Sequence, residues 1–391
     1  MKHVIRNAKV VTPQAVVDKL VVLDNGRISG LHDRLEPPAD AEVIDAKGRY
    51  LSPGFVDIHV HGGGGREVME CVPEAVAVMC RAHLAHGTTS MLPTLSAAPM
   101  DVTLRAVDTV RAAVESGSAP NARGIYLEGP FLSPRQAGAQ DPASLLVPAE
   151  TDWAPLLARW KGVRMIGVAP ELDGAYAFGD AAAAAGVTVS VAHSDAEYAQ
   201  VAGAARHGFT DITHLYSGCS SIVRKSGFRV PGVVEAGLLL DSYTVQVIAD
   251  LCHLPAELLR LVYKCRGADH ISLVTDALPF AGCALEEGKT YLQANGMPTV
   301  YEDGVMKMPD RQAFCGSVAT ADRLVRNLVS IGMDLVDVVR MAATTPARVV
   351  GLGRSKGRIE PGYDADLVLF DKDIQVEEVY LAGEPVARQN D

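Results

Sequence analysis

One short stretch of this chain decides the fold, and it reads Ser52-Pro53-Gly54-Phe55-Val56-Asp57-Ile58-His59-Val60-His61-Gly62. Its apolar residues predict a buried β-strand, and two histidines stand two positions apart at the carboxyl end. Alternate side chains of a strand point to the same side, so His59 and His61 can converge on one point and bind a metal ion. The pattern also occurs on the solvent face of edge strands, so the rest of the chain has to decide.

Downstream of this strand, apolar segments of strand length alternate with segments of helical pattern. The predicted helical segments are 73–86, 100–115, 181–185, 196–207 and 255–266. The eight predicted strands are 55–61, 88–94, 124–128, 164–169, 187–193, 211–215, 244–250 and 271–276. Near-continuous apolar strands that alternate with helices are typical of a parallel sheet buried on both faces. Eight such units predict an α/β fold of the (β/α)8 type, a TIM-like barrel.

Potential metal ligands stand at the carboxyl ends of five of these strands. They are His59, His61, Glu128, His193, His214 and Asp276. In a (β/α)8 barrel these strand ends form the face that carries the active site. Any one of the six, taken alone, is more often a hydrogen-bonded core residue or a surface residue than a metal ligand. Six residues at equivalent strand ends are not explained by chance, so the sequence predicts a metal site at the barrel mouth.

The two ends of the chain predict short strands and turns instead of helices. Neither residues 1–52 nor residues 347–391 contain enough strands for a stable sheet of their own. We therefore expect both ends to pair into one small β-sandwich domain beside a barrel of residues 53–346. Asn25-Gly26 and Ala382-Gly383-Glu384 are typical hairpin turns and support this pairing.

Composition excludes several classes of protein. The chain of 391 residues has a formal net charge of −11, which argues against nucleic-acid binding because phosphate neutralisation needs a basic face. Its seven scattered cysteines contain no Cys-x-x-Cys pair, as expected of a reduced chain without a disulfide framework. The first residues lack a signal-peptide pattern, and no segment approaches the length of a membrane span. We therefore expect a cytoplasmic location and no membrane partner.

Five segments of the chain carry a resemblance to a known family. They are residues 52–62, Leu127-Glu128-Gly129-Pro130-Phe131, Ala192-His193-Ser194, Thr213-His214-Leu215-Tyr216 and Leu273-Val274-Thr275-Asp276-Ala277. These segments resemble the amidohydrolase superfamily and, within it, the N-acetylglucosamine-6-phosphate deacetylase family. Residues 342–348 and 357–367 match the segment that leaves the barrel in this superfamily. The Glu-Gly-Pro motif distinguishes this family from many other amidohydrolases, which have a carboxylated lysine at that position.

The resemblance implies a metal-dependent deacetylase that converts N-acetylglucosamine 6-phosphate and water to glucosamine 6-phosphate and acetate. It implies that Glu128, His193 and His214 hold one divalent metal ion, zinc or alternatively iron, manganese or cobalt. His59, His61 and Asp276, with Glu128 as a bridge, would hold a second ion. Asp276 would also act as the catalytic acid and base, a role typically worth about 10² to 10⁴ in rate.

The resemblance also suggests how the substrate is bound. His253 matches the family histidine that contacts the sugar. In the family an arginine reaches the substrate phosphate across a dimer interface, which implies a homodimer here. Arg229 is its first counterpart and Arg224 the second, both in the compact basic segment 224–232. A solvated basic loop is the alternative interpretation of such a segment.

The chain departs from the family at several substrate-contacting positions. Gln140 replaces a substrate-contacting histidine, and Ser217-Gly218 replaces the usual Asn-Ala. We expect these three residues to contact the substrate. Because the metal and base positions are kept, the departures leave open another N-acyl substrate, such as N-acetylgalactosamine 6-phosphate. A non-catalytic barrel is a further alternative, but such a protein should have lost metal ligands.

Overall fold

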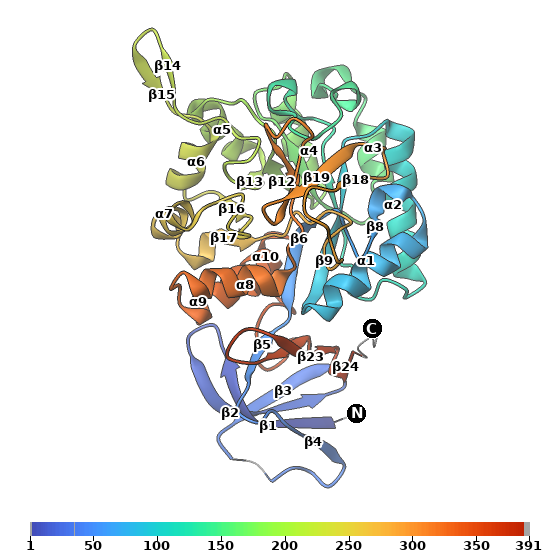
Figure 1. Ribbon diagram of the computed structural model, residues 1–391, viewed down its shortest axis with the longest axis vertical. Coiled ribbons are helices and arrows are strands. Elements are labelled where there is room, and N and C mark those ends of the chain that lie inside the picture. The colour runs from blue at the N-terminus through green and yellow to red at the C-terminus, as the bar shows by residue number, and fades with distance from the viewer. Residues whose placement is uncertain (1, 35, 387–391) are drawn as a thin grey trace.

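The computed structural model describes residues 2–34 and 36–386. It has two parts, a large barrel of strands and helices and a small β domain that contains the first and last strands of the chain (Figure 1). No helix in the described ranges combines the length and apolarity needed to cross a lipid bilayer.

Eight parallel strands form the barrel in the order β17-β16-β13-β12-β11-β10-β9-β6. They are β6 (Phe55–Val60), β9 (Thr88–Ser96), β10 (Ile125–Glu128), β11 (Val163–Val168), β12 (Thr188–Val191), β13 (Phe209–Ile212), β16 (Thr244–Val247) and β17 (Ile271–Leu273). A parallel bridge between Val60 and Ala277 joins β6 to the residues that follow β17, and so brings the two edges of the sheet together. Each strand overlaps one predicted from the sequence, and the (β/α)8 prediction is confirmed.

Helices surround the barrel and cover its strands (Figure 1). They are α1 (Pro73–Ala85), α2 (Met100–Glu115), α3 (Ala154–Arg159), α4 (Ala175–Ala184), α5 (Tyr198–Ala204), α6 (Val233–Leu239), α7 (Ala256–Arg266), α8 (Ala321–Ser330), α9 (Leu335–Val339) and α10 (Thr345–Val349). In α8, Ala321, Leu324, Val325 and Leu328 recur at helical spacing, and all four are buried. One apolar face of this amphipathic helix therefore packs into the core.

Short turns of helix complete the connections. The 3-10 turns are η1 (Val68–Glu70), η2 (Pro134–Gln136), η3 (Pro142–Ser144), η4 (Pro148–Glu150), η5 (Ala205–His207) and η6 (Ala268–His270), and the π-helical turn is η7 (Arg340–Thr344). The predicted helix 196–207 is thus divided into α5 and η5. The predicted segment 181–185 belongs to the longer helix α4, whose earlier residues were not recognised as helical.

Strands from both chain ends form one sheet in the small domain. They are β1 (Lys2–Val11), β2 (Val16–Asp24), β3 (Arg27–His32), β4 (Ala41–Asp45), β5 (Tyr50–Pro53), β22 (Leu367–Phe370), β23 (Val376–Leu381) and β24 (Glu384–Pro385). The two ends meet where Leu51 pairs with Leu369. Both predicted turns are confirmed, because Asn25-Gly26 links β2 to β3 and Ala382-Gly383 links β23 to β24.

The predicted domain boundaries stay a prediction. The first, between residues 52 and 53, lies within β5, just before barrel strand β6. The second, between residues 346 and 347, lies within α10. Ala347 and Val350 are buried in one cluster with Val56 and Ile58 of β6, so the chain still packs against the barrel just beyond residue 347.

Three features of the barrel were not anticipated from the sequence. A four-stranded antiparallel sheet of β18 (Thr290–Leu292), β19 (Pro298–Glu302), β20 (Val305–Lys307) and β21 (Phe314–Gly316) is inserted between β17 and α8. A hairpin of β14 (Val223–Lys225) and β15 (Phe228–Val230) projects from the body of the molecule at the upper left of Figure 1. The pair β7 (Gly62–Gly63) and β8 (Arg66–Glu67) forms a small turn directly after β6.

Candidate active site

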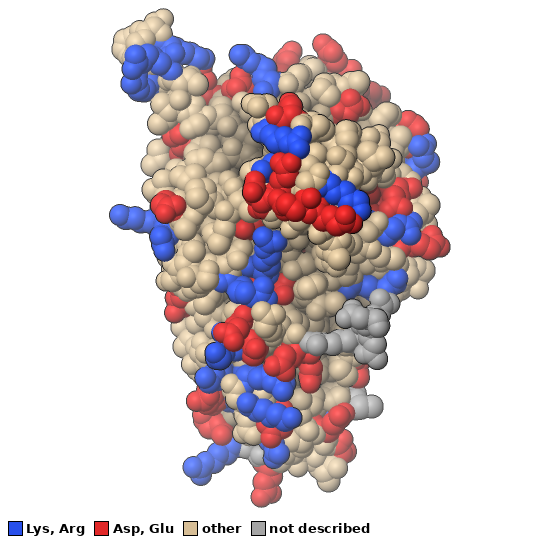
Figure 2. Space-filling model, in the orientation of Figure 1, with Lys and Arg blue, Asp and Glu red and all other residues tan. Residues whose placement is uncertain are grey.

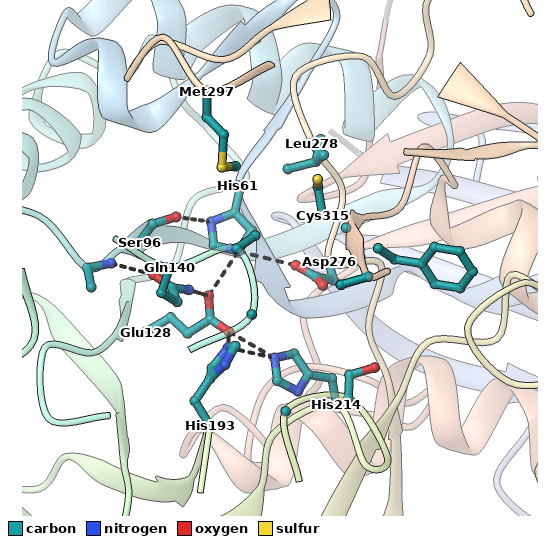
Figure 3. Close-up of a pocket in the computed structure, with 18 of the residues that line it drawn as sticks. His61, Ser96, Glu128, Gln140, His193, His214, Asp276, Leu278, Met297 and Cys315 are labelled. Atoms are coloured by element: carbon teal, nitrogen blue, oxygen red, sulfur yellow. Dashed lines mark hydrogen bonds and ion pairs between the residues drawn. The ribbon is translucent and has the colours of Figure 1, made fainter. Parts of the chain in front are cut away.

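The six predicted ligands meet at the mouth of the barrel. Five of them line a pocket of about 260 Å³ (Figure 3). His59 is fully buried and lies against His61. Each side chain comes from the carboxyl end of a barrel strand or from the first residues after it. The convergence expected from six scattered positions in the sequence is therefore present in the fold.

Glu128, His193 and His214 form the first group. The Oε1 atom of Glu128 lies 3.1 Å from Nε2 of His193 and 3.0 Å from Nε2 of His214. The two Nε2 atoms lie 3.2 Å apart, so the three atoms make a nearly equilateral triangle. All three residues are buried, and this set is one of two groups in the described residues whose ligand atoms lie close enough to share an ion.

His59 and His61 form the second group together with both carboxylates. Their Nε2 atoms lie 3.2 Å apart, and Oδ1 of Asp276 lies 3.3 Å from the first and 3.2 Å from the second. Oε1 of Glu128 lies 3.4 Å from Nε2 of His59, and its Oε2 lies 3.3 Å from Nε2 of His61. Glu128 thus contacts both groups.

These spacings fit a divalent metal ion. Two ligand atoms held about 2.0 to 2.2 Å from a tetrahedral zinc ion lie roughly 3.3 to 3.6 Å from each other. The separations in both groups lie between 3.0 and 3.4 Å, close to that range. Imidazole nitrogen and carboxylate oxygen are also the donors that zinc, iron and manganese accept. The residues present are therefore suited to hold one ion or two.

Hydrogen bonds behind His59 and His193 leave the Nε2 atoms of these two residues free to bind. Nδ1 of His193 donates to the backbone carbonyl of Gln136 over 2.8 Å. Nδ1 of His59 lies 3.1 Å from Oε1 of Gln246, whose Nε2 donates to Asp211 over 2.8 Å. A neutral imidazole that donates from Nδ1 keeps its lone pair on Nε2, which is the usual arrangement for a metal-binding histidine.

Three of the predicted ligands adopt a left-handed backbone conformation. The φ angles of His193, His214 and Asp276 are 43°, 27° and 46°. Residues other than glycine rarely have positive φ, and each such residue costs on the order of 1–3 kcal/mol. Because these residues follow β12, β13 and β17 directly, the strain occurs where the chain leaves the barrel. Strain of this kind is typical of functional sites.

The electrostatics of the site favour bound positive charge. Burial alone would raise the pKa of Glu128, but His59 and hydrogen bonds from His193 and His214 lower that pKa well below its usual range. Burial likewise opposes ionisation of Asp276, yet His59 and His61 lower its pKa. For His61, burial lowers the pKa, but Asp276 and Glu128 outweigh it and raise the pKa to about 10. Both carboxylates are therefore ionised at neutral pH.

Four of the predicted substrate contacts line the same pocket, namely Gln140, Ser217, Gly218 and His253. Nδ1 of His253 donates to Asp250 over 2.8 Å, and its ring packs edge-on against Phe314. At Gly218, φ is +55° and a Cβ atom would lie 2.8 Å from Nδ1 of His193. An alanine therefore does not fit here unless the histidine shifts.

Arg224 and Arg229 do not reach the pocket of their own chain. They face each other across the hairpin β14–β15, both are exposed, and Figure 2 shows basic side chains over this projection. Among the described residues, no lysine or arginine lines the pocket. The hairpin also exposes apolar surface, since Phe228 is 77% exposed.

Sequence reasoning missed two sets of residues around the site. The inserted segment contributes Met297, Phe314 and Cys315 to the pocket. Met297 and Cys315 lie on the side of His61 and Asp276 (Figure 3). The short strands of this segment, which is polar and rich in turns, have no clear periodicity. Gln246 and Asp211 form the second set, in which Gln246 contacts Nδ1 of His59 and donates to Asp211. Each of the two is a polar residue inside an apolar barrel strand. Because a buried polar side chain needs a hydrogen-bond partner, this pattern could have predicted a contact inside the barrel.

Residues 50–386 match the Amidohydrolase family. The human N-acetylglucosamine-6-phosphate deacetylase is 33% identical over 362 residues, which cover 88% of this chain and 85% of that protein. The N-acetylgalactosamine-6-phosphate deacetylase of Shewanella sp. (strain ANA-3) is 31% identical, with coverage of 96% and 94%. The chain belongs to the N-acetylglucosamine-6-phosphate deacetylase family of amidohydrolases.

Solved structures of the N-acetylglucosamine-6-phosphate deacetylase family share this architecture. One is a variant of the Mycobacterium smegmatis enzyme in complex with N-acetyl-D-glucosamine-6-phosphate. It superposes with a TM-score of 0.87 at 29% identity and covers 98% of each chain. The expected amidohydrolase-type barrel with a small β domain is thus confirmed, and the chain is a hydrolase of this family.

Proposed function

We propose that this protein hydrolyses the acetamide of N-acetylglucosamine 6-phosphate to glucosamine 6-phosphate and acetate. The observation that carries the proposal is the joint presence of a three-residue metal-binding group, Glu128, His193 and His214, and an ionised Asp276 beside it in one open pocket. A complete set of three protein ligands is typical of catalytic zinc sites, which keep one position for water or substrate. The names of the relatives supply the substrate class.

We infer that the metal is zinc, with iron, manganese or cobalt as alternatives, and that His59 and His61 allow a second ion. When bound, such an ion lowers the pKa of its water to about 7 and polarises the amide carbonyl. Glu128, His193 and His214 hold the first ion. Asp276 and Glu128 complete the second group with the two histidines, as their contacts of 3.2–3.4 Å support.

Asp276 is the proposed acid and base. It lines the pocket, so a substrate amide can reach it, and its lowered pKa keeps it ionised before reaction. It accepts a proton from the attacking water as the water oxygen bonds to the acetyl carbon. It then donates that proton to the amine nitrogen as the carbon–nitrogen bond breaks. Acetate and a free amino sugar leave, and Asp276 returns to its ionised form.

Recognition of the substrate phosphate supports a homodimer. The pocket is lined by carboxylates, imidazoles and uncharged side chains, and its described part offers no lysine or arginine to a phosphate. The hairpin β14–β15 instead carries Arg224 and Arg229 away from the body of its own chain (Figure 1). Its exposed Ile222, Val223 and Phe228 are the kind of apolar surface that marks an interface. We infer that the hairpin enters the pocket of a second copy, where Arg229 or Arg224 binds the phosphate.

Within the pocket, His253, Ser217 and Gly218 are the proposed sugar contacts. N-acetylgalactosamine 6-phosphate is the second candidate substrate, because a relative of 31% identity carries that name. The two sugars differ only in the configuration of one hydroxyl group, so a few contacts of this kind decide between them. We also infer a cytoplasmic location, which the seven free cysteines support, since structural disulfides are rare in reducing compartments.

The test is a substrate panel with metal analysis of the same purified protein. N-acetylglucosamine 6-phosphate, its galactosamine epimer and unphosphorylated N-acetylglucosamine are compared for release of acetate and free amine. We expect hydrolysis of the phosphorylated sugars, loss of activity on chelation and recovery with added zinc. A fully metal-loaded protein that releases amine from none of the three would overturn the proposal and favour another N-acyl substrate or a non-catalytic barrel.

A further inference from the structure

Gln140 is bonded at both ends of its side-chain amide. Its Nε2 donates to Oε2 of Glu128 over 2.6 Å, and its Oε1 accepts from the backbone N–H of Ala97 over 2.8 Å (Figure 3). Because a backbone N–H can only donate, it fixes the amide oxygen on its own side and turns the NH₂ group toward Glu128. The side chain is only 8% exposed. Its orientation is therefore determined by the protein without any substrate.

The bond from Gln140 reaches one particular oxygen of Glu128. Oε1 is the atom shared with His193 and His214, and it also lies 3.4 Å from Nε2 of His59, whereas Oε2 faces His61 over 3.3 Å. The terminal torsion of a glutamate is broad, so a free carboxylate rotates easily about it. A charge-assisted hydrogen bond to Oε2 restrains that rotation and keeps this oxygen directed at His61.

The end of β9 anchors this arrangement from two neighbouring residues. Ser96 Oγ lies 3.3 Å from Nδ1 of His61, and Ala97 holds the amide of Gln140. Residues 96–97 thus contact His61 directly and hold Oε2 of Glu128 indirectly, through Gln140. The same two-residue segment does not contact His193 or His214 through any described hydrogen bond.

We propose that Gln140 is a positioning residue that orients Glu128 for the second metal ion, the one held by His59 and His61. This inference rests on the metal dependence in the proposed function, and it changes the role expected from the sequence, which was a substrate contact. Loss of a partner that holds a metal ligand typically costs about 10- to 100-fold in metal affinity. Because the bond goes to Oε2, which contacts His61 but neither His193 nor His214, we expect the loss to fall mainly on the second ion.

The test measures metal binding without substrate. Apo protein is dialysed against buffered zinc, and against cobalt so that the absorption spectrum reports each site. Gln140→Ala and Gln140→Met are compared with wild type, the second variant keeping the volume of the side chain but no donor. Gln136→Ala is the matched control, since it removes an amide of the same loop that bonds Asp195, while its backbone carbonyl stays.

We expect wild type and Gln136→Ala to bind two ions. Both Gln140 variants should keep one ion at wild-type affinity and bind the other about 10- to 100-fold more weakly, with unchanged thermal unfolding of the apo protein. Gln140→His, which restores a ring N–H donor, should recover part of the loss. Wild-type affinity for both ions in Gln140→Met, with only KM for the sugar raised, would make Gln140 a substrate contact and overturn the proposal. A wild type that binds a single ion at saturation would overturn it as well. The metal-binding and thermal-unfolding results do not depend on deacetylation, so they can fail or hold independently of the proposed function.

Discussion

The Nε2 atoms of His193 and His214 lie 3.2 Å apart because of strand register. Val191 of β12 pairs with Ile212 of β13, so the residues two positions later also come opposite each other. Both then adopt positive φ angles, which direct the side chains into the barrel mouth. A sheet that holds two strands in register thereby presents two imidazoles, with Glu128 of β10 as the third corner.

This geometry predicts the effect of removing either histidine. His193→Ala and His214→Ala should each lose the ion held with Glu128, because two remaining ligands bind zinc far more weakly than three. Metal content of the purified variants, measured by mass spectrometry, should fall by about one ion per chain. His207→Ala is the control, since His207 is partly exposed and pairs with Asp180 on the surface. Full metal content and activity in the first two variants would place the metal site elsewhere.

The proposed base gives a second prediction. Asp276→Asn keeps the size of the side chain but cannot take a proton from water. We expect a fall in kcat of about 10² to 10⁴, with thermal stability close to wild type. The variant should also keep the first metal ion, because Asp276 contacts only His59 and His61 among the histidines of the site. Turnover within a few-fold of wild type at equal metal content would remove Asp276 from the mechanism.

The barrel and its candidate metal ligands could be predicted from the sequence because each depends on a local pattern. Apolar strands, such as Phe55–Val60, carry their signal in their own residues, and Glu128 or His214 stands at the end of such a strand. The order of parallel strands in a closed barrel then brings distant residues together without further information. This is why six ligand candidates spread over more than half of the chain were recovered as one site.

Other parts of the site depend on contacts that no local pattern reveals. Gln140 lies twelve residues after Glu128, and only the folded loop shows that its amide bonds that carboxylate. Gln246 reads as one polar residue in an apolar strand, and its link from His59 to Asp211 is a property of the barrel interior. The basic segment that carries Arg229 was recognised, but no pattern in it showed that it folds as a hairpin that projects from the body of the chain.

A buried histidine outside the metal groups gives a prediction about pH. His83 of α1 is fully buried, and its Nε2 donates to the carbonyl of Gly62 over 2.8 Å. Burial lowers its pKa to about 4. In the unfolded chain the pKa of this histidine is about 6.5. Between about pH 6.5 and about pH 4, the unfolded state therefore binds a proton that the folded state does not bind. Stability should therefore fall as the pH drops from about 6.5 to about 4, by at most about 3 kcal/mol from this group.

The measurement is chemical unfolding of wild type and His83→Gln at about pH 7.5 and about pH 5. Glutamine keeps a donor for Gly62 but does not titrate, so the variant should lose less stability on acidification than wild type does. Effects of other groups are common to both proteins and cancel in this difference. His207→Gln, at a partly exposed position, should behave as wild type. An equal loss of stability in wild type and His83→Gln would show that His83 does not contribute to acid sensitivity.

The hairpin β14–β15 gives a prediction about phosphate recognition. Arg229→Ala should reduce kcat/KM for N-acetylglucosamine 6-phosphate by well over tenfold, because the loss of one partner of a buried charged pair costs about 2 to 5 kcal/mol. The rate on unphosphorylated N-acetylglucosamine should hardly change. Lys225→Ala is the matched control, since Lys225 lies on the same hairpin but pairs with Glu197 of its own chain.

Mixing two variants tests whether the arginine comes from a second copy. Arg229→Ala chains keep Asp276, and Asp276→Asn chains keep Arg229, so a mixed dimer contains one pocket with both residues intact. After random reassociation of equal amounts, about a quarter of all pockets should be complete, and activity should recover to about that fraction of wild type. Each variant alone should stay inactive or nearly so on the phosphorylated sugar. If mixing restores nothing although mixed dimers are present, the hairpin does not serve a neighbouring pocket. If neither Arg229→Ala nor Arg224→Ala changes the preference for phosphorylated sugar, the phosphate site lies outside the hairpin altogether.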